Sequence, residues 1–183
     1  MLKKTASIRG IYRDIIKDEN HRIIYDSGWK SNLIVDRCRV LIAAFMKNEN
    51  TRGIQKVKLG RGQKEWDNED EGPPAPVPAT AALEDPEPYL VDENAWSLEY
   101  LDENDQHANT PTDRLQVTIT LGENQPPAPA DSVVTTYPIR EFGLFGVFTD
   151  GAGDHDYMID CIRHQVIHKD TSATLIRKVK LYF

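Results

Sequence analysis

The stretch RLQVTITL, residues 114–121, alternates apolar and polar side chains over its whole length. Its four apolar side chains share one face of an extended chain, because successive side chains in a strand point to opposite sides. The stretch TLIRKVKLYF, residues 174–183, alternates in the same way. Two strands of this kind predict an antiparallel β-sheet with one face packed on a core.

Further strands are predicted on both sides of these two. Residues 5–30 predict a β-hairpin around the charged turn KDENH, and residues 53–60 predict a strand that ends in a sharp turn at Gly60-Arg61-Gly62. The other predicted strands cover residues 133–136, 139–148 and 157–167.

One helix is predicted, over residues 36–47. Asp36 is expected to cap its first turn. Its apolar stripe has helical spacing and consists of Ile34, Cys38, Leu41, Ile42 and Phe45. Six or seven short strands with one helix predict a mainly-β fold, an antiparallel β-sandwich with the helix packed on an edge or end, in one domain over residues 1–183.

Residues 65–94 predict a long acidic, proline-rich loop within that domain. They contain 10 Asp and Glu but no Lys or Arg, and six of the 11 prolines lie between Pro73 and Pro88. Fixing a backbone costs about 1–2 kcal/mol per residue, so an ordered loop of this length needs a compensating surface. We expect the loop to lie over its own domain or over a neighbouring subunit.

Charge and composition exclude several classes of protein. The net charge is −7, although residues 1–61 carry 14 Lys and Arg against 6 Asp and Glu. These basic residues are scattered singly without aromatic interleaving, so nucleic-acid binding is not expected. The longest apolar run, residues 40–46, is far shorter than the ~20 residues of a membrane span. No signal peptide is expected, and two cysteines make no disulfide scaffold.

Three clusters resemble metal sites, and each is better explained by local structure. His164 and His168 lie four apart in a predicted strand, which separates them by about 13 Å. The acidic run from Asp67 to Gly72 resembles a calcium loop but has Pro78 at the position of the bidentate carboxylate. The run from Asp150 to Asp156 has the residues that a hairpin turn needs. We therefore expect no metal, no cofactor and no enzyme activity, since no nucleophile motif is present either.

Several segments, in order along the chain, resemble elements of bacteriophage tail and tail-fibre-attachment proteins. Trp29 to Asp36 resembles a W-x-x-N-L-[IV]-x-[DN] element before a helix, and Ile139 to Phe145 resembles an [IL]-x-E-[AIV]-G-L-F element. The other similar segments are residues 53–62, 78–83, 158–161 and 171–183. The chain departs from the family in its expanded acidic loop and in Asp160, where a small residue is usual.

The resemblance implies a structural subunit of a phage tail or of a related contractile injection particle, at a baseplate, collar or fibre-attachment position. Such a protein is expected to be made in the bacterial cytoplasm and assembled into the particle. Its partners would be other subunits, including copies of itself in a trimer or hexamer. A basic first third and an acidic loop could provide complementary contacts between copies.

The resembling segments contain the candidate site residues. Trp29 is expected to anchor the core, and Asn32 to fix the strand-to-helix corner by bonding nearby backbone. Gly60 and Gly62 would turn the chain into the loop. Glu141 is either a solvent-facing strand residue or a buried or interfacial charge with a basic partner. The strand continues through Gly143, Leu144 and Phe145.

Two other functions remain open. A carbohydrate- or ligand-binding β-sandwich would need an exposed aromatic platform, for which the candidates are Trp66, Tyr89, Trp96 and Tyr100. A hydrolase with an unrecognised site is the second alternative.

Overall fold

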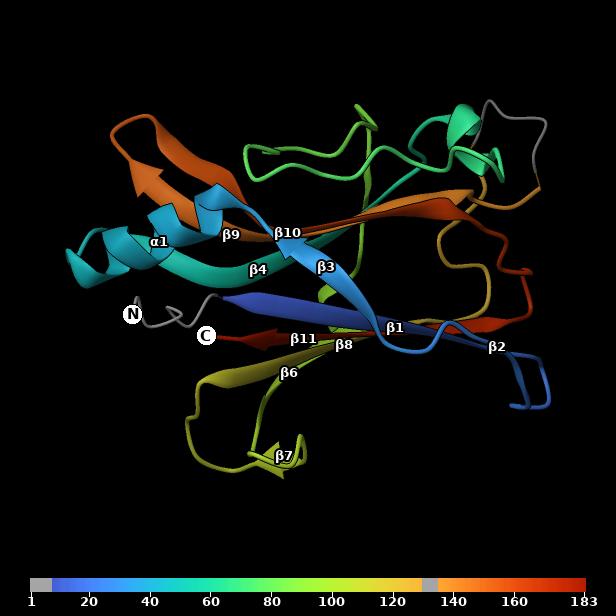
Figure 1. Ribbon diagram of the computed structural model, residues 1–183, viewed down its shortest axis with the longest axis horizontal. Coiled ribbons are helices and arrows are strands. Elements are labelled where there is room, and N and C mark those ends of the chain that lie inside the picture. The colour runs from blue at the N-terminus through green and yellow to red at the C-terminus, as the bar shows by residue number, and fades with distance from the viewer. Residues whose placement is uncertain (1–7, 130–134) are drawn as a thin grey trace, which may run out of the picture.

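The computed structural model describes residues 8–129 and 135–183 (Figure 1). Eleven strands, one α-helix and two short 3₁₀ helices follow one another along the chain: β1 (Arg9–Lys17), β2 (Ile23–Asp26), β3 (Lys30–Ile34), α1 (Asp36–Met46), β4 (Thr51–Gly60), η1 (Lys64–Asp67), β5 (Tyr89–Leu90), η2 (Glu93–Ala95), β6 (Trp96–Leu101), β7 (His107–Ala108), β8 (Arg114–Leu121), β9 (Ile139–Asp150), β10 (Gly153–Ile167) and β11 (Thr174–Tyr182). The mainly-β prediction with one helix is confirmed.

The strands form one antiparallel sheet that folds over on itself. Its order is β5-β4-β9-β10-β3-β1-β11-β8-β6-β7, with β2 paired to the side of β1. Strand β3 makes the bend, since it pairs with β1 through residues 30–32 and with β10 through Leu33 and Ile34. The half with β4, β9 and β10 thus faces the half with β1, β11 and β8, as a sandwich, with the main apolar core between them (Figure 1).

Most of the predicted strands are confirmed. In β8, Val117, Ile119 and Leu121 are buried, as the alternation predicts. Strands β1 and β2 form the predicted hairpin, although residues 5–7 lie outside the described part of the chain. Of the strand predicted at residues 133–136, residues 133 and 134 also lie outside it, and residues 135 and 136 form a bend.

Helix α1 packs against β4, β9 and β10, near the end of the sandwich where the chain finishes (Figure 1). Val35 occupies its N-cap position without a side-chain hydrogen bond, so the cap predicted for Asp36 is wrong; the Asp36 carboxylate accepts a bond from Arg39 instead. The predicted apolar stripe also includes more residues than the helix buries. Ile42 and Phe45 are exposed, because the helix covers only part of the open end.

The segment between β4 and β6 forms a layer over the outer face of β9 and β10 (Figure 1). It has little regular structure, as predicted, and it lies over its own domain. Trp66, Leu83 and Val91 are buried under or within it. Strand β9 is consequently covered on both faces, and each of its residues from 139 to 147 is buried. Within the described residues, α1, with 11 residues, is too short to traverse a bilayer.

Candidate functional site

The structure brings three predicted residues, Gly60, Gly62 and Glu141, into one cluster. Glu141 belongs to β9, and its register partner on β4 is Gly60. Its side chain is completely buried, so the solvent-facing alternative is wrong. The carboxylate accepts hydrogen bonds from two backbone N–H groups of the acidic segment, those of Glu84 (2.9 Å) and Asp85 (2.7 Å). Glu141 therefore fastens this segment to the sheet.

Its partners differ from the basic residue that the sequence predicts. Burial raises the pKa of Glu141, and the two backbone N–H groups act in the opposite direction because they stabilise the charged form. A carboxylate oxygen is an acceptor only, so a backbone N–H can bond it in place of a basic side chain.

The two glycines are required by close approach and by backbone conformation. A Cβ on Gly60 would lie 2.4 Å from Glu141 Oε1, so no other residue leaves room for the carboxylate. Gly62 has φ +53°, and a Cβ there would lie 2.4 Å from the ring of Trp66. Both glycines thus begin the segment, as predicted.

Three ion pairs hold the same segment, and sequence reasoning found none of them. The buried Asp85 carboxylate accepts from the backbone N–H and the guanidinium of Arg61, at 2.8–3.0 Å. Burial opposes the charge of Asp85, but the bonds from Arg61 outweigh it and lower the pKa to about 2. The other pairs are Arg140 with Asp67 (2.6 Å) and Arg163 with Glu84 (2.7 Å).

The remaining predicted residues lie outside this cluster. Gly143, Leu144 and Phe145 are buried in the middle of β9, and the Lys58 ammonium lies 4.6 Å from the centre of the Phe145 ring. Trp29 is 39% exposed, so its prediction as a core anchor is wrong. Its ring instead supports the ammonium of Lys180 at 4.6 Å.

The prediction that the Asn32 side chain bonds nearby backbone is wrong. It bonds a carboxylate that is far away in the sequence. Its Nδ2 donates to Asp160 Oδ2 at 2.7 Å, across the bend between β3 and β10. Asp160 is completely buried, and its Oδ1 has no hydrogen-bond partner within the described residues. Burial raises the pKa of Asp160 to about 7, against the effect of Asn32.

A second buried charge lies near Asp160. Arg177 on β11 donates two hydrogen bonds to Asp14 on β1, at 2.5 and 2.8 Å, and both side chains are 2% exposed. Arg177 Nη2 also lies 2.7 Å from His164 Nε2. Because arginine can only donate, Nε2 accepts, and the proton of the neutral ring lies on Nδ1, which donates to the carbonyl of Gln165. Burial and the charge of Arg177 lower the pKa of His164 to about 4.

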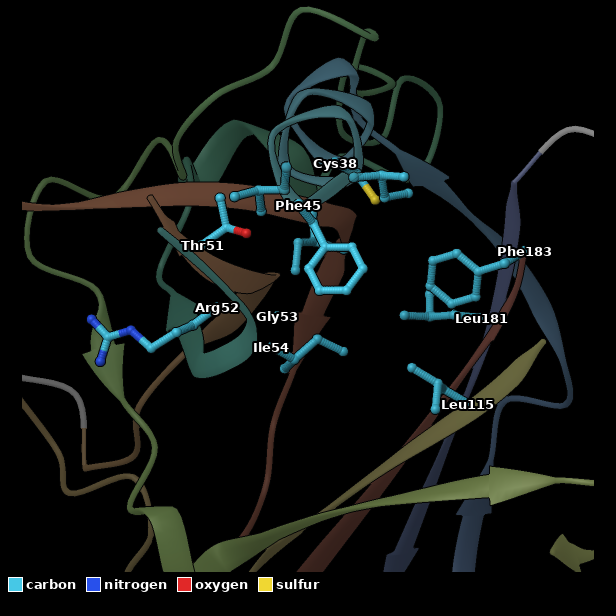
Figure 2. A pocket seen from close by; sticks show the side chains of 12 residues that line it. Cys38, Phe45, Thr51, Arg52, Gly53, Ile54, Leu115, Leu181 and Phe183 are labelled. Carbon is cyan, nitrogen blue, oxygen red and sulfur yellow. The ribbon is translucent and has the colours of Figure 1, made fainter. Parts of the chain in front are cut away.

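The end of the sandwich beside α1 contains an apolar cavity of about 320 Å³ (Figure 2). Phe45 of α1 and Phe183 face one another across it, and both are exposed. Ile54, Leu115 and Leu181 line its inner side. A cavity of this composition suits an apolar side chain of a partner better than a polar substrate.

The other candidate sites have structural partners. Asp67, from the calcium-like run, binds Arg140, and Asp150 binds the ring of His155 at 3.0 Å. Among the residues described, no three His, Cys, Asp or Glu side chains gather as metal ligands would. Of the four aromatic candidates for a sugar platform, Trp66 is buried, Tyr89 and Trp96 pack against the core, and Tyr100 is exposed.

Glu141→Gln is predicted to reduce the free energy of unfolding by about 1–3 kcal/mol, because the amide nitrogen leaves one buried N–H of the acidic segment without an acceptor. Urea denaturation measures this loss. The exposed Glu103→Gln is the matched control and should change little. Equal stability of the two variants would refute the role given to Glu141.

Asp160→Asn is predicted to change how stability depends on pH. The raised pKa of Asp160 makes wild-type stability fall as the pH rises from about 4 to about 7, whereas the lowered pKa of His164 makes it rise between about 4 and 6.5. The two effects oppose one another in the wild type, and the variant loses that of Asp160 while it keeps that of His164.

The difference in unfolding free energy between Asp160→Asn and the wild type should therefore move in favour of the variant as the pH rises through this range. Urea denaturation at several pH values measures it. Asp113→Asn, at an exposed position, is the control. A difference that does not change with pH would show that Asp160 is ionised throughout.

Comparison with known proteins adds no relative. No family model matches the chain, and no curated protein or solved structure is detectably similar to it. The resemblance to phage tail elements therefore stays a prediction from the sequence segments.

Proposed function

We propose that the chain is a structural subunit of a bacteriophage tail or a related contractile injection particle, at a baseplate, collar or fibre-attachment position. It acts by docking with copies of itself and with other subunits rather than by catalysis. The order of the resembling sequence segments supports the proposal that the chain belongs to such a particle. The apolar cavity beside α1 supports the proposal that it acts by docking.

The exposed apolar surface around that cavity is the observation that carries the proposal. Phe45 is 68% exposed and Met46 77%, and Ile42 and Phe183 are also exposed. Side chains of this size, gathered around a concave apolar site, are typical of protein–protein contacts. Burying a Phe side chain stabilises by about 1.5–3 kcal/mol, so covering this surface with a partner is favourable.

A second copy of the chain is the occupant we propose, through its β1–β2 hairpin. Ile23 on β2 is exposed, and β2 lies at the opposite end of the molecule from α1 (Figure 1). The turn before it carries Asp18 and Glu19, and α1 carries two basic residues, Arg37 and Arg39, of which Arg39 is paired with Asp36. The apolar side chain at one end thus matches the apolar cavity at the other, and the acidic side chains of the turn can meet Arg37.

A contact between unlike ends can close a ring. Each copy uses its cavity for one neighbour and its hairpin for the other, so the contact is heterologous. A trimer or a hexamer is the ring that we propose, following the symmetry of a tail tube.

The experiment is sedimentation velocity over a range of concentrations. The wild type should assemble into one closed species. Phe45→Ser should raise the dissociation constant about 10- to 100-fold, from the lost burial of the ring. Val40→Ser is the matched control, because Val40 is exposed on the same helix but does not line the cavity.

Mixing two variants tests the heterologous contact itself. A Phe45→Ser chain keeps its hairpin, and an Ile23→Ser chain keeps its cavity, so an equimolar mixture should form a dimer and nothing larger. A wild type that stays monomeric at every concentration, or a Phe45→Ser chain that assembles like the wild type, would overturn docking through this cavity.

A further inference from the structure

A second cleft lies at the hairpin end of the sandwich, opposite α1. Its volume is about 470 Å³, and it lies between β1, β2, the start of β3 and the last residues of β10. Unlike the cavity beside α1, it has a mixed lining of phenol, ammonium, imidazole and aliphatic groups. Clefts of this size with a few polar groups are typical of small-ligand sites.

The floor of the cleft is fixed and electrically balanced. Tyr12, Asp14 and Ile16 share one face of β1, since they alternate along the strand. Both oxygens of Asp14 accept hydrogen bonds from Arg177, so the guanidinium already compensates the charge of this carboxylate. His164 lines the floor as a neutral ring whose two nitrogens are already bonded.

The donors that remain lie along this floor. Lys30 is the register partner of Tyr12, whereas Tyr25 is the register partner of Ile16, four residues or about 13 Å further along β1. Within the described residues, no hydrogen bond or ion pair engages the ammonium of Lys30 or the hydroxyls of Tyr12 and Tyr25. An ammonium and two phenol hydroxyls are donors that suit an anion.

Nearby charged groups also favour an anion. Among the lining residues Lys30 has the one charge without a counter-charge in the described structure, and His168 adds a ring that can donate. Asp26, close to Tyr25, is neutralised by Arg13 through a bidentate pair. The walls beyond the donors are apolar, with Ile24, Val166 and Ile167.

We propose that this cleft binds a small carboxylate that carries an apolar body. The ammonium of Lys30 and the hydroxyl of Tyr12, which are register partners, hold the carboxylate group, and the body extends along β1 towards Tyr25 and packs against Ile24 and Val166. The site is independent of the proposed docking, because the side chain that we assign to docking, Ile23, does not line the cleft.

The test is isothermal titration of the full chain with benzoate, in the wild type and in Phe45→Ser, so that the result does not depend on assembly. Two further probes each lack one feature of benzoate: benzyl alcohol has no charge, and inorganic phosphate has no apolar body. We expect saturable binding of benzoate to both proteins, and at least tenfold weaker binding of the other two probes.

Variants then locate the site. Lys30→Met should weaken benzoate about tenfold or more through the loss of a charge-assisted hydrogen bond, and Tyr12→Phe should weaken it several-fold. Lys64→Met, at an exposed lysine outside the cleft, should leave the affinity unchanged. Unsaturable binding, equal affinity for phosphate, or an affinity that Lys30→Met does not alter would overturn the proposal.

Discussion

The buried carboxylate of Glu141 is the contact on which the outer layer of this fold depends. It lies near the start of β9 and accepts hydrogen bonds from backbone N–H groups of a segment that is acidic, rich in proline and poor in regular structure. The ordering of such a segment costs about 1–2 kcal/mol per residue. Glu141 and the Arg61–Asp85 pair hold it close enough for Trp66 and Leu83 to be buried, and their burial offsets part of that cost.

The outer layer also explains why the two ends of the sandwich differ. With β9 covered on both faces, the middle of the molecule is closed, and the openings lie at its two ends. At one end α1 leaves an apolar cavity with exposed aromatic rings, and at the other the hairpin borders a cleft over the buried pair of Asp14 and Arg177. We assign the first end to docking and the second to a small anion.

The sequence predicts the strands well because their signal is local. The apolar side chains of β8 and β11 alternate with the two-residue period of a strand, and most of them are buried in the structure. The acidic segment is also recognisable, since proline and like charges disfavour helix and sheet. The cap predicted at Asp36 is a local error, but the other errors and omissions concern partners far away in sequence. Asp14 and Arg177 lie 163 positions apart, and nothing near Trp29 indicates that Lys180 will cover its ring.

Amide hydrogen exchange at Glu84 and Asp85 tests most directly whether Glu141 makes the acidic segment part of the fold. Our account predicts that these two N–H groups exchange as slowly as those of β9, because they open only when the domain unfolds. Exchange at the rate of an exposed loop, with β9 still protected, would show that the segment lies on the sheet without being held there.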